Sequence, residues 1–212
     1  MPANSMILMP PLVLLSVSTS VIAQQDFRFI DGNGEPVAGL VIELHDEEAT
    51  EVSGGISIID QINRTFVPMI RAINPGQSVS FPNSDNVRHH VYSFSEIKQF
   101  STPLYANENI DPVTFEQPGI AVLGCNIHDS MVAYVYVSSW ATWYQTDEHG
   151  KVSVTIPQHI NEVHLWHPWL QTTDNRQVIN STDLNGQDVT IQLDIQSPQQ
   201  TLGFRALRQD AP

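Results

Sequence analysis

The chain of 212 residues has one cysteine, Cys125, and only nine lysine and arginine residues against 23 acidic ones. A single thiol cannot form an internal disulfide. The formal net charge of -14 leaves no basic face for phosphate groups, which argues against nucleic acid as a partner. The acidic excess either keeps the protein soluble or steers it toward a basic partner such as a cytochrome or an oxidoreductase.

The sequence also lacks long apolar stretches at helical spacing. Short runs rich in Val, Ile, Tyr and Phe alternate with turn-forming segments, and the chain has 14 prolines and 11 glycines. This pattern predicts an all-β chain. A length of 212 residues suits one or two small domains with a sizeable core.

Residues 1–23 have the pattern of an export signal. They contain no acidic residue, an apolar centre over residues 6–17 and a small-residue end at Ala23. Lys and Arg are missing as well, which leaves an uncleaved anchor as the alternative, although Pro10 and Pro11 interrupt a short apolar core. We expect cleavage after Ala23, a periplasmic or secreted protein, and no membrane span in the remainder.

The single cysteine lies in the segment GCNIHDSM, residues 124–131, followed by a near-continuous apolar run over residues 132–137. His128 and Met131 follow Cys125 at offsets of three and six residues. A thiolate, an imidazole and a thioether are three of the four ligands of a mononuclear copper electron-transfer site, which needs a second histidine. The alternative is a buried structural cysteine, but the fixed offsets of His128 and Met131 favour the metal site.

The second histidine is expected in the segment FPNSDNVRHHVYS, residues 81–93, where a polar turn leads into a strand. Because successive strand residues point to opposite faces, only one of His89 and His90 can face the cysteine loop. The residues alone leave a one-residue slip between the two open. The other histidine would be exposed or would orient a ligand.

With both segments in view, the chain resembles the cupredoxins, the plastocyanin and amicyanin group of small blue copper proteins. The C-x2-H-x2-M loop has the compact amicyanin spacing. Residues 66–169 look most like bacterial methylamine utilisation or plastocyanin-like proteins, through His-His-Val-Tyr-Ser, Gly-Cys-Asn-Ile-His and a late Trp-His-Pro. The resemblance implies one copper ion in a type 1 site held by His89, Cys125, His128 and the weak axial Met131.

The chain departs from the family at two places near this site. His90 stands where plastocyanins usually have an asparagine that braces the ligand loop, and Asp129 and Ser130 replace an apolar pair of amicyanin. A polar loop implies a different partner or weaker docking than in that family. The other histidines have simpler explanations: His45, His149 and His159 lie in polar stretches and are expected to be solvated. His164 and His167 flank Trp166, which is expected to pack.

Segments before and after the copper-type region weakly resemble the carboxypeptidase regulatory-like β-sandwich. Strands are predicted at residues 27–30 and 40–44, joined by a turn-forming run, and a second pair is predicted near residues 151–156 and 163–169. Residues 95–118 have room for a short helix, which Pro103 and Pro112 limit to a turn or two.

The predicted fold is therefore a Greek-key β-sandwich of cupredoxin type, flanked by or inserted in a second small β-sandwich. The expected division of the chain is a signal peptide at 1–23, N-terminal sandwich strands at 24–55, a cupredoxin-like copper segment at 56–138, C-terminal sandwich strands at 139–195 and a flexible tail at 196–212.

Three functions fit these motifs. The first is an exported one-electron carrier with a redox partner such as a c-type cytochrome or a dehydrogenase. The second is a protein that binds or delivers copper or zinc without a redox role, since Cys/His ligation also suits zinc. The third is a β-sandwich binding module with an empty site. No Ser/His/Asp set, phosphate loop or paired carboxylates lie near the motifs, so we expect no enzyme activity.

Overall fold

The computed structural model describes residues 24–47, 49, 55–184 and 189–196. The predicted signal peptide and almost all of the predicted tail lie outside these residues. The described chain is built from strands, with one 3-10 turn, η1, at Ser181–Leu184, so the all-β prediction is confirmed. Among these residues no helix is long and apolar enough to cross a bilayer. Residues 95–118 contain strands and loops instead of the short helix considered above.

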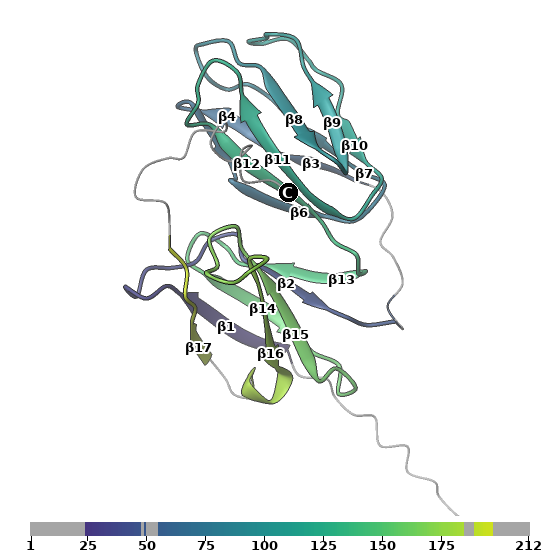
Figure 1. Ribbon diagram of the computed structural model, residues 1–212, viewed down its shortest axis with the longest axis vertical. Helices are drawn as coiled ribbons and strands as arrows, with labels where there is room; N and C mark the ends of the chain where they lie inside the picture. Colours follow the sequence, from purple (N-terminus) through teal and green to yellow (C-terminus); the bar gives the residue numbers. More distant parts are fainter. Residues whose placement is uncertain (1–23, 48, 50–54, 185–188, 197–212) are drawn as a thin grey trace, which may run out of the picture.

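One group of strands, here called the inserted sandwich, comes from the middle of the chain (Figure 1). Its larger sheet has the order β6-β12-β11-β8-β9 and its smaller sheet the order β10-β7-β3, with the short hairpin β4-β5 beside them. The strands are β3 (Ile56–Ile58), β4 (Asp60–Ile62), β5 (Thr65–Val67), β6 (Ile70–Ile73), β7 (Gln77–Ser80), β8 (Val91–Ser95), β9 (Lys98–Ser101), β10 (Val113–Phe115), β11 (Gly119–Cys125) and β12 (Val132–Val137).

The other group, here called the outer sandwich, combines strands from both ends of the described chain. Its sheets have the orders β14-β1-β17 and β13-β2-β15-β16. The strands are β1 (Gln24–Ile30), β2 (Val41–Leu44), β13 (Thr142–Gln145), β14 (Lys151–Thr155), β15 (Glu162–Trp166), β16 (Arg176–Asn180) and β17 (Val189–Gln192).

The first two strands are present as predicted, but they do not pair as one hairpin. β1 pairs with β14 and β17, while β2 pairs with β13 and β15 in the facing sheet. The burial pattern explains the difference. β1 alternates between exposed and buried residues, as expected for a sheet with one solvated face, whereas every residue of β2 is buried. β2 therefore belongs in a sheet that is covered on both faces.

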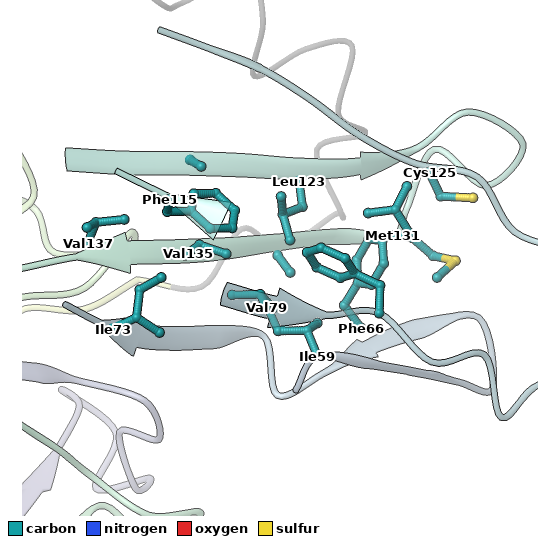
Figure 2. Close-up of a cluster of buried hydrophobic side chains, with 14 of the residues drawn as sticks. Ile59, Phe66, Ile73, Val79, Phe115, Leu123, Cys125, Met131, Val135 and Val137 are labelled. Carbon is teal, nitrogen blue, oxygen red and sulfur yellow. The ribbon is translucent and has the colours of Figure 1, made fainter. Parts of the chain in front are cut away.

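Each sandwich has its own apolar core. A third cluster joins them, because it combines residues of β6 and β12 in the inserted sandwich with residues of β2 and β15 in the outer one: Val41, Ile70, Ala72, Tyr134, Tyr136 and Trp166. Burial of these side chains fixes the inserted sandwich on the outer one. Figure 2 shows the core of the inserted sandwich, in which Cys125 and Met131 lie at one end.

Candidate metal centre

Cys125 is the last residue of β11, and its side chain is fully buried. In the sheet, Cys125 lies opposite Val91 of β8, and Gly124 lies opposite Val132 of β12. The thiol is therefore held between the strand that follows His89 and the strand that follows Met131. Strand pairing, rather than proximity along the chain, brings these segments together.

His89 lies just before β8 and is also fully buried. Its backbone is fixed by two hydrogen bonds with Tyr105, from His89 N to Tyr105 O at 2.9 Å and from Tyr105 N to His89 O at 3.0 Å. The imidazole Nδ1 lies 3.7 Å from Cys125 Sγ. The other nitrogen, Nε2, lies 2.8 Å from a carboxylate oxygen of Asp85.

Asp85 determines which nitrogen of His89 can bind a metal. Its carboxylate accepts backbone N–H groups from Asn63 at 2.9 Å and Arg64 at 2.7 Å, so the remaining donor toward it is the Nε2–H of His89. Burial alone would raise the pKa of Asp85, but the hydrogen bonds from Arg64, His89 and Asn63 hold that pKa below its ordinary value. An ionised Asp85 favours the tautomer that presents the Nδ1 lone pair to the site.

His128 lies in the loop between β11 and β12. This loop ends in a turn closed by a hydrogen bond from Met131 N to His128 O at 3.0 Å. His128 Nδ1 lies 3.8 Å from Cys125 Sγ and 3.2 Å from His89 Nδ1. The pKa of His128 is lowered by burial and by the nearby His89 and Arg64, against the opposing effect of Asp85. His128 is the partly exposed member of the group, whereas His89 and Cys125 are buried.

Met131 is almost completely buried in the same apolar cluster as Cys125. Figure 2 shows the sulfur atoms of both residues at the same end of this cluster. The packing of Met131 against apolar neighbours leaves its thioether close to the cysteine end of the sandwich.

The positions of the three donor atoms suit a metal ion. His89 Nδ1, His128 Nδ1 and Cys125 Sγ all lie within 4.8 Å of one another. The centre of the triangle that they form is about 2.1 Å from each atom, close to ordinary metal–nitrogen and metal–sulfur bond lengths. Two imidazoles and a thiolate with a nearby thioether form the donor set of a type 1 copper site. The residues therefore fit a copper ion.

The structure places His90 away from this group. Its Nε2 lies 2.8 Å from the hydroxyl of Ser101, and its ring stacks on Tyr92 with 5.6 Å between ring centroids. The sequence singled out four residues. The donor atoms of His89, Cys125 and His128 lie close together, and Met131 packs in the same apolar cluster as Cys125. His90 lies just before β8 and contacts Ser101 and Tyr92 instead of the cysteine, as alternation of side chains along an extended segment predicts.

Sequence reasoning missed Asp85 and Tyr105. Tyr105 is buried, donates its hydroxyl hydrogen to Phe81 O and accepts a hydrogen bond from Gln61 Nε2 at 2.6 Å. Burial raises the pKa of Tyr105 to about 12. The position of Asp85 four residues before His89 was a usable signal, whereas the pairing of Tyr105 with His89 has no signature in the sequence.

No protein-family model and no curated protein match the chain. Solved structures similar to it include the purple cupredoxin from Nitrosopumilus maritimus, at 23% identity over 39% of this chain and 99% of that chain, with a TM-score of 0.36. Amicyanin from Paracoccus versutus is 17% identical over 46% of this chain and 97% of that chain, with a TM-score of 0.36.

A copper-containing nitrite reductase from Thermus scotoductus SA-01 is 22% identical over 46% of this chain, with a TM-score of 0.39. The chain spans only 26% of that enzyme. The resemblance of the flanking strands to the carboxypeptidase regulatory-like sandwich stays a prediction. These three solved structures are two cupredoxins and a copper-containing enzyme, at identities where the likeness concerns the fold alone.

Proposed function

We propose that this protein is an exported copper protein that carries one electron, with one ion held by His89, Cys125, His128 and Met131. The observation that carries the proposal is the convergence of two imidazole Nδ1 atoms and one cysteine sulfur from two distant segments. Copper in such a site supplies one-electron chemistry without a change of ligands.

The surroundings of the donors support electron transfer over transient metal delivery. His89 is fixed through its backbone by Tyr105 and through its ring by Asp85, and Cys125 lies within a paired strand. A frame that holds its donors in place keeps the reorganisation that accompanies electron transfer small. A delivery site, in contrast, has to release its ion.

The exposure of the donors supports His128 as the point where the electron leaves. His89, Cys125 and Met131 are buried, whereas His128 is partly exposed at the end of the sandwich. A redox protein, such as a c-type cytochrome or a dehydrogenase, would dock over this loop. The formal charge of -14 favours a basic partner through long-range attraction.

The test is the optical spectrum of the purified chain titrated with Cu(II). We expect one copper per chain and an intense band near 600 nm (roughly, for copper-thiolate charge transfer), which Cys125→Ala abolishes. His89→Gln is expected to abolish the band, and the matched variant His90→Gln is expected to keep it. A colourless protein with copper demonstrably bound, or a bound metal that cannot be reduced and reoxidised, would contradict the electron-carrier role.

A further inference from the structure

A hollow on the solvent face of the sheet β14-β1-β17 has no part in the proposed copper chemistry. Its volume is about 440 Å³. The hollow is lined by Asp26, Phe27, Arg28, Lys151, Val152, Ser153 and Thr190. The hollow lies on strands β1, β14 and β17 of the outer sandwich, whereas Cys125 ends strand β11 of the inserted sandwich. Figure 1 shows these strands in separate groups. A ligand in this hollow would therefore leave the metal centre untouched.

The hollow places two cations side by side. Arg28 of β1 and Lys151 of β14 are direct partners in the antiparallel ladder, and both side chains are exposed. Like charges directly opposite each other destabilise a sheet. Among the described residues, no carboxylate lies within ion-pair distance of either cation. The nearby Asp147 instead accepts backbone N–H groups, including that of Lys151. Neither cation therefore forms an ion pair, although the charges of Asp147 and Lys151 attract each other at longer range.

Apart from Phe27 and Val152, the other residues that line the hollow are polar and include one acid. Asp26 lies opposite Ser153, whose hydroxyl donates a hydrogen bond to the Asp26 carboxylate. Thr190 of β17 lies beside Arg28 on its other side. The cations and the Asp26–Ser153 pair are therefore two rows of the sheet, separated by two residues, or about 7 Å along the strand.

These two rows favour one kind of ligand. The cation row suits a carboxylate, and the Asp26 row suits hydroxyl groups that can donate hydrogen bonds. Asp26 repels a dianion such as phosphate, and the strong net negative charge of the chain disfavours polyanions. The volume of the hollow lies within the range of small-molecule sites.

We propose that this hollow binds a hydroxylated carboxylic acid of the sugar-acid class, either a free uronate or a uronate unit of a glycan. Arg28 and Lys151 hold the carboxylate, and Asp26, Ser153 and Thr190 hold the hydroxyls. The unfavourable pairing of two cations is then relieved by the ligand. Binding sites often retain such locally destabilising arrangements because function needs them.

Calorimetric titration of the full-length, copper-loaded protein tests the proposal with four probes: galacturonic acid, trigalacturonic acid, galactose and inorganic phosphate. We expect galacturonic acid to bind and galactose and phosphate to bind much more weakly. Tighter binding of the trimer than of the monomer would identify a glycan as the source of the ligand, and equal binding would identify the free acid.

Arg28→Gln and Lys151→Gln are each expected to weaken galacturonate binding at least tenfold (about the loss of one charge-assisted hydrogen bond). Each is also expected to raise the thermal midpoint of the ligand-free protein, because the like-charge contact is gone. The control Lys98→Gln removes one charge from strand β9 of the inserted sandwich and should change neither quantity. The proposal fails if galacturonate does not bind at roughly 10 mM, if phosphate binds as tightly, or if Lys98→Gln has the same effect.

Discussion

Asp85 lies in a polar turn, yet it supports both a residue of the metal centre and a neighbouring hairpin. Its carboxylate joins the tip of the β4-β5 hairpin to the ring of His89, through hydrogen bonds from Asn63, Arg64 and His89. Asn63 and Arg64 both have positive φ angles, 52° and 59°, so their adjacent N–H groups can point at one carboxylate. A single side chain thus orients a ligand and anchors a hairpin.

The variant Asp85→Asn is expected to bind copper about 10- to 100-fold more weakly, because an amide no longer fixes the His89 tautomer with a charged acceptor. Competition with a chelator of known affinity measures the loss. Asp60→Asn is the matched control: Asp60 caps the neighbouring Ser84, through bonds to its N–H and hydroxyl, but does not contact His89. Equal copper affinities for Asp85→Asn and the unaltered protein would show that His89 is oriented by its backbone alone.

At the scale of elements, the sequence predicted what strand alternation and motif spacing can encode. The offsets between Cys125, His128 and Met131 describe a loop between two strands, and that loop joins β11 and β12. The histidine segment lies where a turn leads into β8. Alternation also limits the ligand to one of His89 and His90, and the structure places His89 beside the cysteine.

What the sequence could not predict depends on pairing between distant segments. The separation of β1 and β2 into different sheets follows from partners more than a hundred residues away, β14 and β15. His45 was expected to be solvated, but it stacks between Trp140, at 4.4 Å, and His164, at 3.5 Å. These contacts join three segments that are far apart in the sequence, so no local pattern predicts them.

The turn before β14 requires a glycine at position 150. Gly150 has a φ of 70°, and a Cβ there would clash with the carbonyl oxygen of Phe29, which accepts the N–H of Val37. Gly150→Ala is expected to lower the free energy of unfolding by at least about 3 kcal/mol, since it adds backbone strain and displaces this hydrogen bond. Urea denaturation measures it.

Gly34→Ala is the control for this substitution. Gly34 also has a positive φ, 85°, but a Cβ there would meet nothing within 4 Å. Gly34→Ala should therefore lower the free energy of unfolding only through backbone strain, by about 1 kcal/mol. If both variants lost the same stability, the close contact with Phe29 would have no energetic importance.

At the scale of the whole molecule, a buried and a half-buried histidine make stability depend on pH. Burial lowers the pKa of His167 to about 4, an effect that a hydrogen bond with the backbone of Ala38 opposes only in part. Burial and the nearby His164 also lower the pKa of His45. The folded state therefore binds fewer protons than the unfolded state. The contribution of these histidines to the free energy of unfolding is complete above the ordinary histidine pKa and is lost as the pH falls below it.

For His167, we expect the free energy of unfolding to fall by about 2–4 kcal/mol between pH 6.5 and 4. Urea unfolding of the metal-free protein at a series of pH values measures it. In the variant His167→Gln, the free energy of unfolding should depend less steeply on pH over this range, even though the variant is less stable at pH 7. The exposed His149 serves as the control, since His149→Gln should keep the original slope. A stability that is constant from pH 7 to pH 4.5 would contradict the prediction.

The contact between the two sandwiches contains a buried ionic group as well as an apolar cluster. Glu43 of β2 is buried, accepts a hydrogen bond from the Ser138 hydroxyl at 2.6 Å and lies 3.5 Å from the guanidinium of Arg176. Arg176 also donates to the hydroxyl of Tyr136 at 2.7 Å and covers its ring. Since Tyr136 belongs to β12 of the inserted sandwich, Arg176 of β16 connects the two cores.

Arg176→Met is therefore expected to destabilise both sandwiches together, by about 1–3 kcal/mol. This figure is less than for a fully buried pair, because Arg176 is partly exposed and solvent screens it. Calorimetry should show one transition before and after the substitution, with equal calorimetric and van't Hoff enthalpies. Arg28→Met, on the far sheet, should instead raise stability slightly, by no more than about 0.5 kcal/mol, because it removes the like-charge contact with Lys151.

The same coupling predicts how copper acts on the whole chain. An ion bound only by the folded inserted sandwich raises its stability by mass action. If the sandwiches unfold as one unit, copper must raise the midpoint of the single transition, including the part that belongs to the outer sandwich. Two separate transitions, of which copper moves only one, would mean that the cluster around Tyr136 and Trp166 holds the sandwiches in place without making their folding cooperative.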